Sequence, residues 1–133
     1  MQSSPGKIEP RAEERGTYRP DEDSQRAAIA AARAAQEKKA EGVVVLDLRG
    51  VSGYTDFLVI GTGTSDRQLE AIADGVEKEL TAQGHRVIGS EGQRGGRWVL
   101  LDFGDVVVHV FHPEERAHYD LEGLWSDAPM TRP

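Results

Sequence analysis

The chain has 133 residues, enough for one domain, with 38% hydrophobic and 29% charged side chains and a formal net charge of −7. It contains no cysteine, which excludes a disulfide framework, a thiolate zinc site and a thiol nucleophile. No apolar run approaches the ~20 residues that cross a bilayer, and the N-terminus lacks the apolar centre of a signal peptide. We therefore expect a cytoplasmic protein without a membrane association. The acidic balance disfavours direct contact with nucleic acid and favours a basic protein partner.

The N-terminal part predicts a tail followed by one helix. Residues 1–22 mix Pro, Gly, Ser and both charge signs without periodicity, so we expect them to be disordered. An alanine-rich helix follows, capped by Asp23 or Ser24 and ended by Gly42. Because Ile29 is its only large apolar residue, this helix is expected to dock lightly.

Two short β-branched segments, at 43–48 and 56–63, predict strands. The second runs into GTGTSD and then a helix, as a dinucleotide-binding motif would. Its third glycine is replaced by Asp66, however, whose carboxylate would repel a pyrophosphate. We interpret the segment instead as a capping box, in which Ser65 and Gln68 satisfy each other's backbone donors.

The next helix is amphipathic and is predicted to end at Gly84. Its apolar residues recur at helical spacing: Leu69, Ile72, Ala73, Val76 and Leu80. A short edge strand at 85–90 and a flexible turn at 91–97 should lead to two further strands, at 98–103 and 106–111.

These two strands are joined by Gly104-Asp105, a two-residue hairpin signal in which glycine adopts a positive φ at little cost. The loop sets the register and therefore which side chains share a face. One face is wholly apolar and should lie against the helices: Val99, Leu101, Phe103, Val106, Val108 and Val110. The other is mixed: Trp98, Leu100, Asp102, Val107, His109 and Phe111. It could be a protein interface, a second core layer or a small-molecule site, and its partly uncovered aromatic residues favour an interface.

Catalytic interpretations of this hairpin are weak. Asp102, Phe103 and Gly104 match the magnesium-binding tripeptide of protein kinases, but the sequence lacks the other kinase motifs. His109 and His112 are three apart on a strand, so they point to opposite faces and cannot easily share a metal ion. Asp102 lies diagonally opposite His109, and we interpret the two as a hydrogen-bonded polar pair rather than a catalytic one.

The C-terminal stretch PEERAHYDLEGLW predicts a short helix that begins at Pro113. It is either a solvated helix anchored in the core by Leu121 and Leu124, or an acidic and aromatic docking edge beside Trp98. The predicted order is α-β-β-α-β-β-β-α, which indicates a single α/β domain with a mixed sheet of about five strands. Residues 129–133 are expected to form a C-terminal tail.

Several motifs that occur together and in order resemble one bacterial family. They are VVVLDL, TDFLVIGTGTSDRQLEAIADGVEKEL and GRWVLLDFGDVVVHVFHPEERAHYDLEGLW. This combination resembles the ribosomal silencing factor family, also called RsfS, YbeB or Iojap-like, and it assigns residues 23–128 to that domain. The resemblance implies a nucleotidyltransferase-like topology. The metal-binding acidic pair of nucleotidyltransferases is not matched, because neither DED at 21–23 nor DLE at 120–122 follows a glycine turn on a strand.

The resemblance implies a translational repressor that is not an enzyme and needs no cofactor or metal. Such a protein binds the large ribosomal subunit through universal large-subunit ribosomal protein fourteen, blocks association with the small subunit and slows translation when nutrients are scarce. Two alternatives stay open: a large-subunit assembly factor, and a small nucleotide-binding or nucleotide-transferring enzyme that uses Asp56, Asp102 and His109.

The resemblance and the face assignment together give the expected protein-binding residues: Trp98, Leu100, Asp102, His109, Phe111, Tyr119, Leu121, Glu122 and Trp125. The aromatic residues would anchor the partner, while Asp102 and Glu122 would pair with its lysines or arginines. The same patch could also support a homodimer.

Overall fold

The structure is a computed structural model that describes residues 20–92 and 96–133. The predicted disordered tail, as far as residue 19, and the centre of the predicted turn, at 93–95, lie outside the described residues. The boundary between the predicted disordered tail and the domain therefore stays a prediction.

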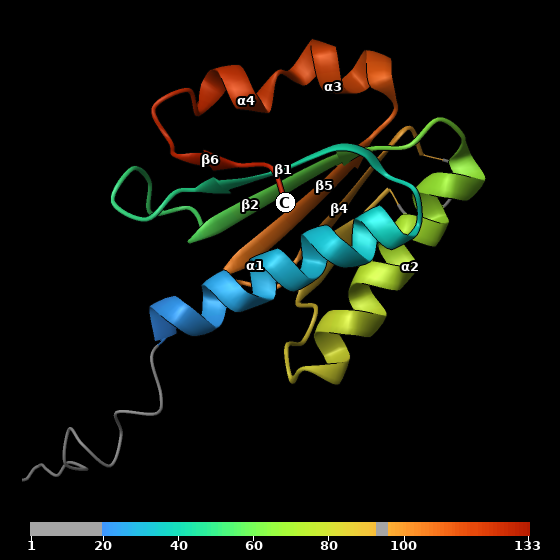
Figure 1. Ribbon diagram of the computed structural model, residues 1–133. Coiled ribbons are helices and arrows are strands. Elements are labelled where there is room, and N and C mark those ends of the chain that lie inside the picture. Colours follow the sequence, from blue (N-terminus) through green and yellow to red (C-terminus); the bar gives the residue numbers. More distant parts are fainter. Residues whose placement is uncertain (1–19, 93–95) are drawn as a thin grey trace, which may run out of the picture.

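Four helices and six strands in the described residues form one α/β unit (Figure 1). The elements are α1 (Pro20–Glu37), β1 (Glu41–Asp47), β2 (Phe57–Thr62), α2 (Asp66–Ala82), β3 (Gly89–Glu91), β4 (Trp98–Asp102), β5 (Val106–Phe111), α3 (Pro113–Tyr119), α4 (Leu121–Leu124) and β6 (Met130–Thr131). The strands form one mixed sheet in the order β3-β4-β5-β2-β1-β6. The central pair, β2 and β5, is parallel, and the other neighbouring strands are antiparallel. The predicted fold class is confirmed.

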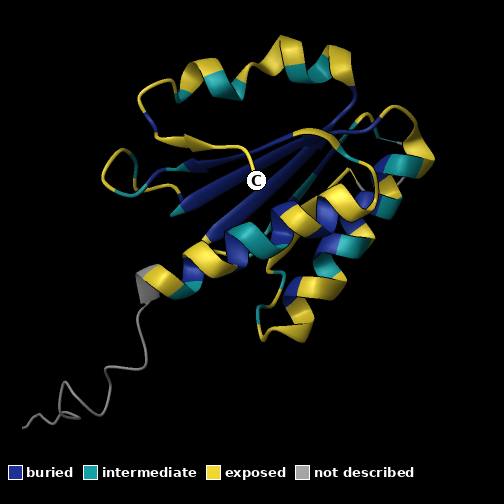
Figure 2. Ribbon diagram, in the orientation of Figure 1, coloured by how far each residue is buried: buried dark blue, intermediate teal, exposed yellow. Residues whose placement is uncertain are grey.

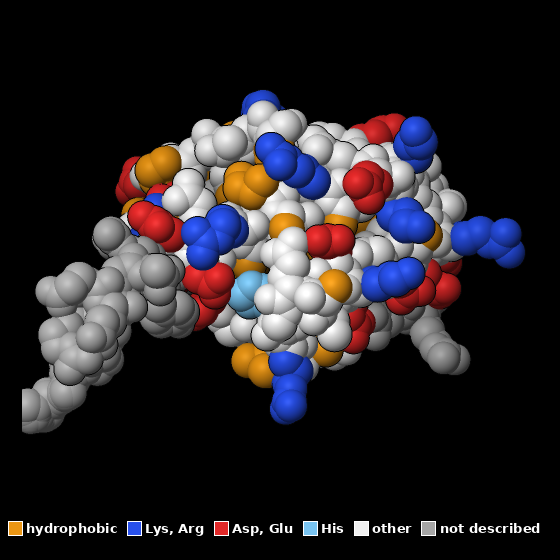
Figure 3. All heavy atoms as spheres, turned by 60° about the horizontal axis from the view of Figure 1, so that its bottom comes forward, with side chains coloured by type: hydrophobic (Ala, Val, Ile, Leu, Met, Phe, Trp, Pro, Cys, Tyr) orange, Lys and Arg blue, Asp and Glu red, His pale blue; other side chains and the backbone are white. Residues whose placement is uncertain are grey.

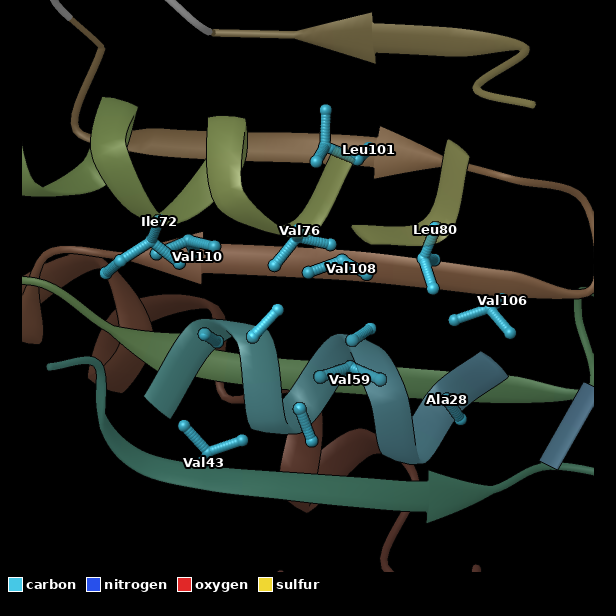
Figure 4. Packing of buried hydrophobic residues seen from close by; sticks show 14 of the residues in the cluster. Ala28, Val43, Val59, Ile72, Val76, Leu80, Leu101, Val106, Val108 and Val110 are labelled. Atoms are coloured by element: carbon cyan, nitrogen blue, oxygen red, sulfur yellow. The ribbon is translucent and has the colours of Figure 1, made fainter. Parts of the chain in front are cut away.

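The sheet lies between two unequal layers of helices. The long helices α1 and α2 cover one face, and the short helices α3 and α4 lie over the other (Figure 1). On the first face, Ile72, Val76 and Leu80 of α2 pack against the strands near Val108 and Val110 of β5 (Figure 4). The strands are buried throughout the centre of the sheet, whereas α3 and α4 keep exposed outer surfaces (Figure 2). The second face is also buried at its centre, and its partly exposed residues lie on β4, at Trp98, Leu100 and Asp102.

The predicted hairpin register is confirmed in β4 and β5. Val99 pairs with Val110 and Leu100 pairs with His109. Gly104 adopts a φ of 89°, the left-handed conformation that the two-residue turn requires. The predicted apolar face belongs to the core beneath α1 and α2: Val99, Leu101, Val106, Val108 and Val110 are buried, with Phe103 partly buried beside them.

The caps of α2 follow the sequence prediction with two small changes. Ser65 is the N-cap, and its hydroxyl accepts a hydrogen bond from the Gln68 backbone N–H at 3.1 Å. The Gln68 side chain reaches one residue further back than a capping box requires, because its Oε1 accepts from the Thr64 N–H at 2.7 Å. At the other end Gln83 is the C-cap, and the predicted Gly84 follows it with a φ of 92°.

Both predicted ends of α1 are wrong. The helix begins at Pro20, three residues before the predicted caps, since proline is favoured in the first turn. Ser24 lies inside the helix, where its hydroxyl donates to Asp56 at 3.3 Å. The helix ends at Glu37, and Gly42 instead lies within β1.

The alanine-rich face of α1 is buried rather than lightly docked. Six alanines are at most 7% exposed: Ala27, Ala28, Ala31, Ala32, Ala34 and Ala35. Small side chains let the helix backbone approach the sheet and α2 closely, so packing compensates for the lack of large apolar residues.

The C-terminal residues belong to the fold, which corrects the expected tail at 129–133. Leu46 of β1 pairs with Met130, so β6 makes a sixth strand at the edge of the sheet. Beyond it, the Gln36 side chain donates to the carbonyl oxygen of Pro133 at 2.9 Å. At the opposite edge, the strand predicted at 85–90 is shorter and displaced to β3.

We expect Gly104→Ala to lower the free energy of unfolding by about 1 kcal/mol, because a side chain at a positive φ is strained. Space is not limiting, since an added Cβ would meet only Ile88 Cδ1 at an ordinary 3.7 Å. Gly53→Ala is the matched control, because Gly53 has open space around it and no positive φ. Denaturant unfolding should separate the two variants. Equal stabilities would contradict a turn that depends on the glycine conformation.

Candidate protein-binding surface

Four aromatic rings stack on the sheet face beneath α3 and α4. Three come from the predicted mixed face of the hairpin, and Tyr119 comes from the last residue of α3. The Trp98 ring lies 5.8 Å from His109, 6.1 Å from Phe111 and 5.8 Å from Tyr119, measured between centroids. Alternation along β4 and β5 places the first three rings on one face, and α3 brings the fourth over them. We call Trp98, His109, Phe111 and Tyr119 the aromatic cluster.

A hydrogen bond inside the aromatic cluster replaces the predicted Asp102–His109 pair. The Trp98 indole N–H donates to His109 Nδ1 at 2.9 Å, so the proton of the neutral imidazole lies on Nε2. Asp102 instead accepts a hydrogen bond from the Gly104 backbone N–H at 2.8 Å, which supports the hairpin turn. Burial lowers the pKa of His109 to about 4, because the charged imidazolium would lose its hydration there.

The aromatic cluster is graded from buried to exposed. Phe111 is 1% exposed and His109 is 6% exposed, whereas Tyr119 is 53% exposed. Trp98 and Leu100 lie between these extremes and pack against the second core cluster with Leu121 and Trp125 of the C-terminal segment. A partner that docks on this face can reach Tyr119 directly, whereas Phe111 and His109 support the surface from below.

One arginine connects the short helices α3 and α4 to the sheet. Arg116 of α3 donates from Nε and Nη2 to Glu122 of α4, at 3.2 and 2.7 Å. Its Nη1 donates to the hydroxyl of Thr62, at the end of β2, at 2.8 Å. One guanidinium therefore ties both short helices to the sheet. Glu122 is thus paired within the domain, and its contact with a basic residue of a partner stays a prediction.

The predicted C-terminal helix is broken into two at Asp120. Asp120 has a φ of 47°, which ends α3, and its carboxylate accepts from the Gly123 N–H at 3.1 Å to cap α4. The break turns α4 so that Leu121 packs against the sheet side while Leu124 is 67% exposed. Leu124 is therefore not the core anchor that one of the two sequence interpretations required.

A small apolar pocket of about 290 Å³ opens between α4 and the loop before β2. Its lining residues are Tyr54, Leu58, His109, Leu121, Leu124 and Trp125. Tyr54 is 52% exposed and was not among the residues predicted from sequence. The only signal was an aromatic residue in a polar loop, and sequence could not bring that loop next to α4.

The residues of the catalytic alternative are engaged separately. Asp56 accepts from Ser24, Asp102 from a backbone N–H, and His109 from Trp98. Within residues 20–92 and 96–133 no group of three or more His, Asp or Glu side chains is arranged to hold a metal ion. No helix in this part of the chain combines the length and apolar character that a membrane crossing requires.

The outer surface over α1 and α2 has a different character. Figure 3 shows basic and acidic side chains side by side on that face, with only small apolar areas between them. The fold and the aromatic cluster thus define a small α/β domain with one charged helical face and one half-covered aromatic face.

The model of the family "Ribosomal silencing factor during starvation" (RsfS) matches residues 21–133, and the chain therefore belongs to this family. It is 50% identical over 101 residues to the ribosomal silencing factor RsfS of Halalkalibacterium halodurans, covering 76% of this chain and 86% of that protein. It is 34% identical over 94 residues to the mouse protein "Mitochondrial assembly of ribosomal large subunit protein 1", covering 68% and 41%. A crystal structure from Chromobacterium violaceum aligns with a TM-score of 0.74 at 38% identity, covering 77% of this chain and 85% of that chain. The family resemblance predicted from the motifs is confirmed.

His109 should make stability depend on pH. Its folded pKa is about 4, below the usual 6.5, so the neutral form favours folding above pH 6.5 and this contribution is lost as pH falls towards 4. His109→Asn is the control, because it keeps an acceptor for Trp98 but does not titrate. Between pH 7 and pH 4.5, the free energy of unfolding should fall by roughly 2 kcal/mol more in the wild type than in this variant. Denaturant unfolding at both pH values measures the difference, in which the other titrating groups cancel. Parallel losses would contradict a buried neutral His109.

Arg116→Lys should keep the positive charge but lose the planar fork, and we expect the free energy of unfolding to fall by about 2 kcal/mol. Arg97→Lys is the control, because Arg97 pairs with Glu114 and Glu115 at the exposed start of α3. Its stability should be nearly unchanged. Hydrogen exchange should also show faster opening of α3 and α4 in Arg116→Lys alone. Equal protection of these helices in both variants would contradict the role of Arg116.

Proposed function

We propose that the protein is a translational repressor that binds the large ribosomal subunit through universal large-subunit ribosomal protein fourteen. Bound there, it blocks association with the small subunit and slows translation under nutrient limitation. Family membership supports a link to the ribosome, because the bacterial relative is named a silencing factor and the mouse relative an assembly protein of the large subunit.

The observation that supports a docking function most strongly is the exposure of large apolar side chains on and beside the aromatic cluster. Tyr119 and Leu124 are more than half exposed on the same pair of short helices, with Tyr54 across the pocket from α4. Aromatic and aliphatic side chains held in place by a rigid sheet are typical anchors of protein interfaces. An apolar patch of this kind has no evident role in an isolated domain.

Acidic side chains around this surface support a basic partner. Asp102, Asp120 and Asp127 form no ion pair with a lysine or arginine of the described residues. Ribosomal proteins that contact ribosomal RNA are rich in basic residues, and a negative surface attracts such partners over several ångströms. We assign direct contact to the exposed and partly exposed members of the predicted set, and a supporting role to the buried ring of Phe111.

Two alternative functions can be distinguished by experiment from that of a translational repressor. An assembly factor would use the same surface but would leave mature subunits, and the name of the mouse relative favours this reading. A nucleotide-binding enzyme would be stabilised by nucleotides and magnesium in a thermal shift assay. The expected homodimer through the same face also stays a prediction.

We expect the wild-type protein to sediment with purified large ribosomal subunits and to reduce the yield of joined ribosomes when small subunits are added. Tyr119→Ala should weaken binding about tenfold, because an exposed anchor is removed while the fold is kept. Thr81→Ala is the control, since Thr81 is exposed on α2, which covers the opposite face of the sheet. Wild-type protein that stays in the supernatant would refute the proposal. Binding without any effect on joined ribosomes would favour the assembly factor instead.

A further inference from the structure

We propose that the pocket between Tyr54 and α4 is an anchor site for one apolar side chain from a basic segment of the partner. This inference rests on the proposed function, because the partner is the protein that docks on the aromatic face. It adds Tyr54 and Leu124 to that surface, and neither residue was among the predicted contacts.

The shape of the pocket favours a single inserted side chain. Leu58 is fully buried at its base, and the exposed rings and methyl groups of Tyr54 and Leu124 lie on its borders. Its volume of about 290 Å³ is sufficient for a leucine, methionine or phenylalanine side chain. An inserted side chain would remove both exposed border residues from water, which is the arrangement found at the centre of interface hot spots.

His109 offers the pocket one hydrogen-bond donor, which a bound segment has to satisfy. Its Nδ1 is occupied by Trp98, which leaves the proton on Nε2. Nε2 has no hydrogen-bond partner within the described residues, and it is not among their fully enclosed unpaired atoms. Because His109 lines the pocket and its Nε2 is neither paired nor fully enclosed, we infer that Nε2 faces the pocket. The inserted segment should therefore present one acceptor, such as a backbone carbonyl oxygen, next to its apolar side chain.

The charges around the pocket determine the kind of segment. Asp102 accepts from the Gly104 N–H, and Thr55, next to Tyr54, donates to the Gly104 carbonyl oxygen, so the carboxylate and the Tyr54 loop meet at the same turn. Burial and, to a smaller extent, this carboxylate raise the pKa of Tyr54. Asp120 and Asp127 flank α4 on either side, without an ion pair to a described lysine or arginine. Glu122 is neutralised by Arg116, so the remaining field is negative. A segment with lysine or arginine next to its apolar residue fits this field.

Two substitutions at one exposed position separate the apolar contribution from the charge. Leu124→Glu and Leu124→Lys both remove the apolar side chain, but they place opposite charges at the pocket border. With purified large ribosomal subunits as the probe, we expect Leu124→Glu to bind about tenfold more weakly than wild type. Leu124→Lys should bind about a hundredfold more weakly, and the gap between the two should shrink at high salt. Thr81→Lys, which adds the same charge on α2 at the opposite face of the sheet, should bind within about twofold of wild type.

A second variant tests the polar requirement without depending on Leu124. His109→Asn keeps an acceptor for Trp98, but its shorter amide has no donor at the position of Nε2, and we expect about threefold weaker binding at pH 7.5. Unfolding measurements on each variant confirm that the fold is intact.

Each outcome has one meaning. If both Leu124 variants bind like wild type while Tyr119→Ala binds weakly, the anchor pocket is wrong and the proposed function stands. If the Glu and Lys variants weaken equally, the partner segment is not basic and the inference fails in that form. If wild-type protein does not bind large subunits, the proposed function and the anchor pocket fail together.

Discussion

The register of the β4–β5 hairpin is the constraint on which the rest of the molecule depends. Because side chains alternate across a strand, a slip of one residue would turn Val99 and Val110 away from the helices and bury Trp98 and His109 beneath them. The turn at Gly104 prevents that slip. One choice of register thus provides the core of the domain on one face of the sheet and the aromatic cluster on the other.

The cover over the second face is incomplete only along β4. After β5, two short helices and one short strand bury the centre of this face but leave Trp98 and Leu100 of β4 partly exposed. Arg116 holds this segment close enough to shield Phe111 and His109, while Tyr119 and Leu124 stay exposed. The surface is therefore apolar, rigid from below and open to a partner. Such preorganisation lowers the entropic cost of docking.

Turn residues, caps and apolar periodicity were sufficient to predict the β4–β5 hairpin and helix α2. The hairpin follows from Gly104-Asp105 between β-branched runs, and α2 follows from Ser65, its apolar stripe and Gly84. The hairpin register then yielded the composition of both sheet faces. These are the elements for which turn chemistry and periodicity agree with the tertiary structure.

The features that sequence could not give are contacts between distant residues. The pairing of Met130 with β1 made a strand from an expected tail, and the meeting of Trp98 with His109 replaced the diagonal partner Asp102. Tyr54 joins the candidate surface only because its loop lies beside α4. The start of α1 was missed because Asp21 and Glu22 follow a Pro-, Gly- and Ser-containing stretch without periodicity and resemble its continuation, although proline and acidic residues also favour a first helical turn.

The most direct test of the central claim is a cryo-electron microscopy structure of the protein bound to the large ribosomal subunit. We predict that Tyr119, Leu124 and Tyr54 lie within the protein interface, with a side chain of a ribosomal protein in the pocket above His109. The charged face of α1 and α2 should point away from that protein. A complex in which α1 and α2 form the contact and the aromatic cluster faces solvent would contradict the claim.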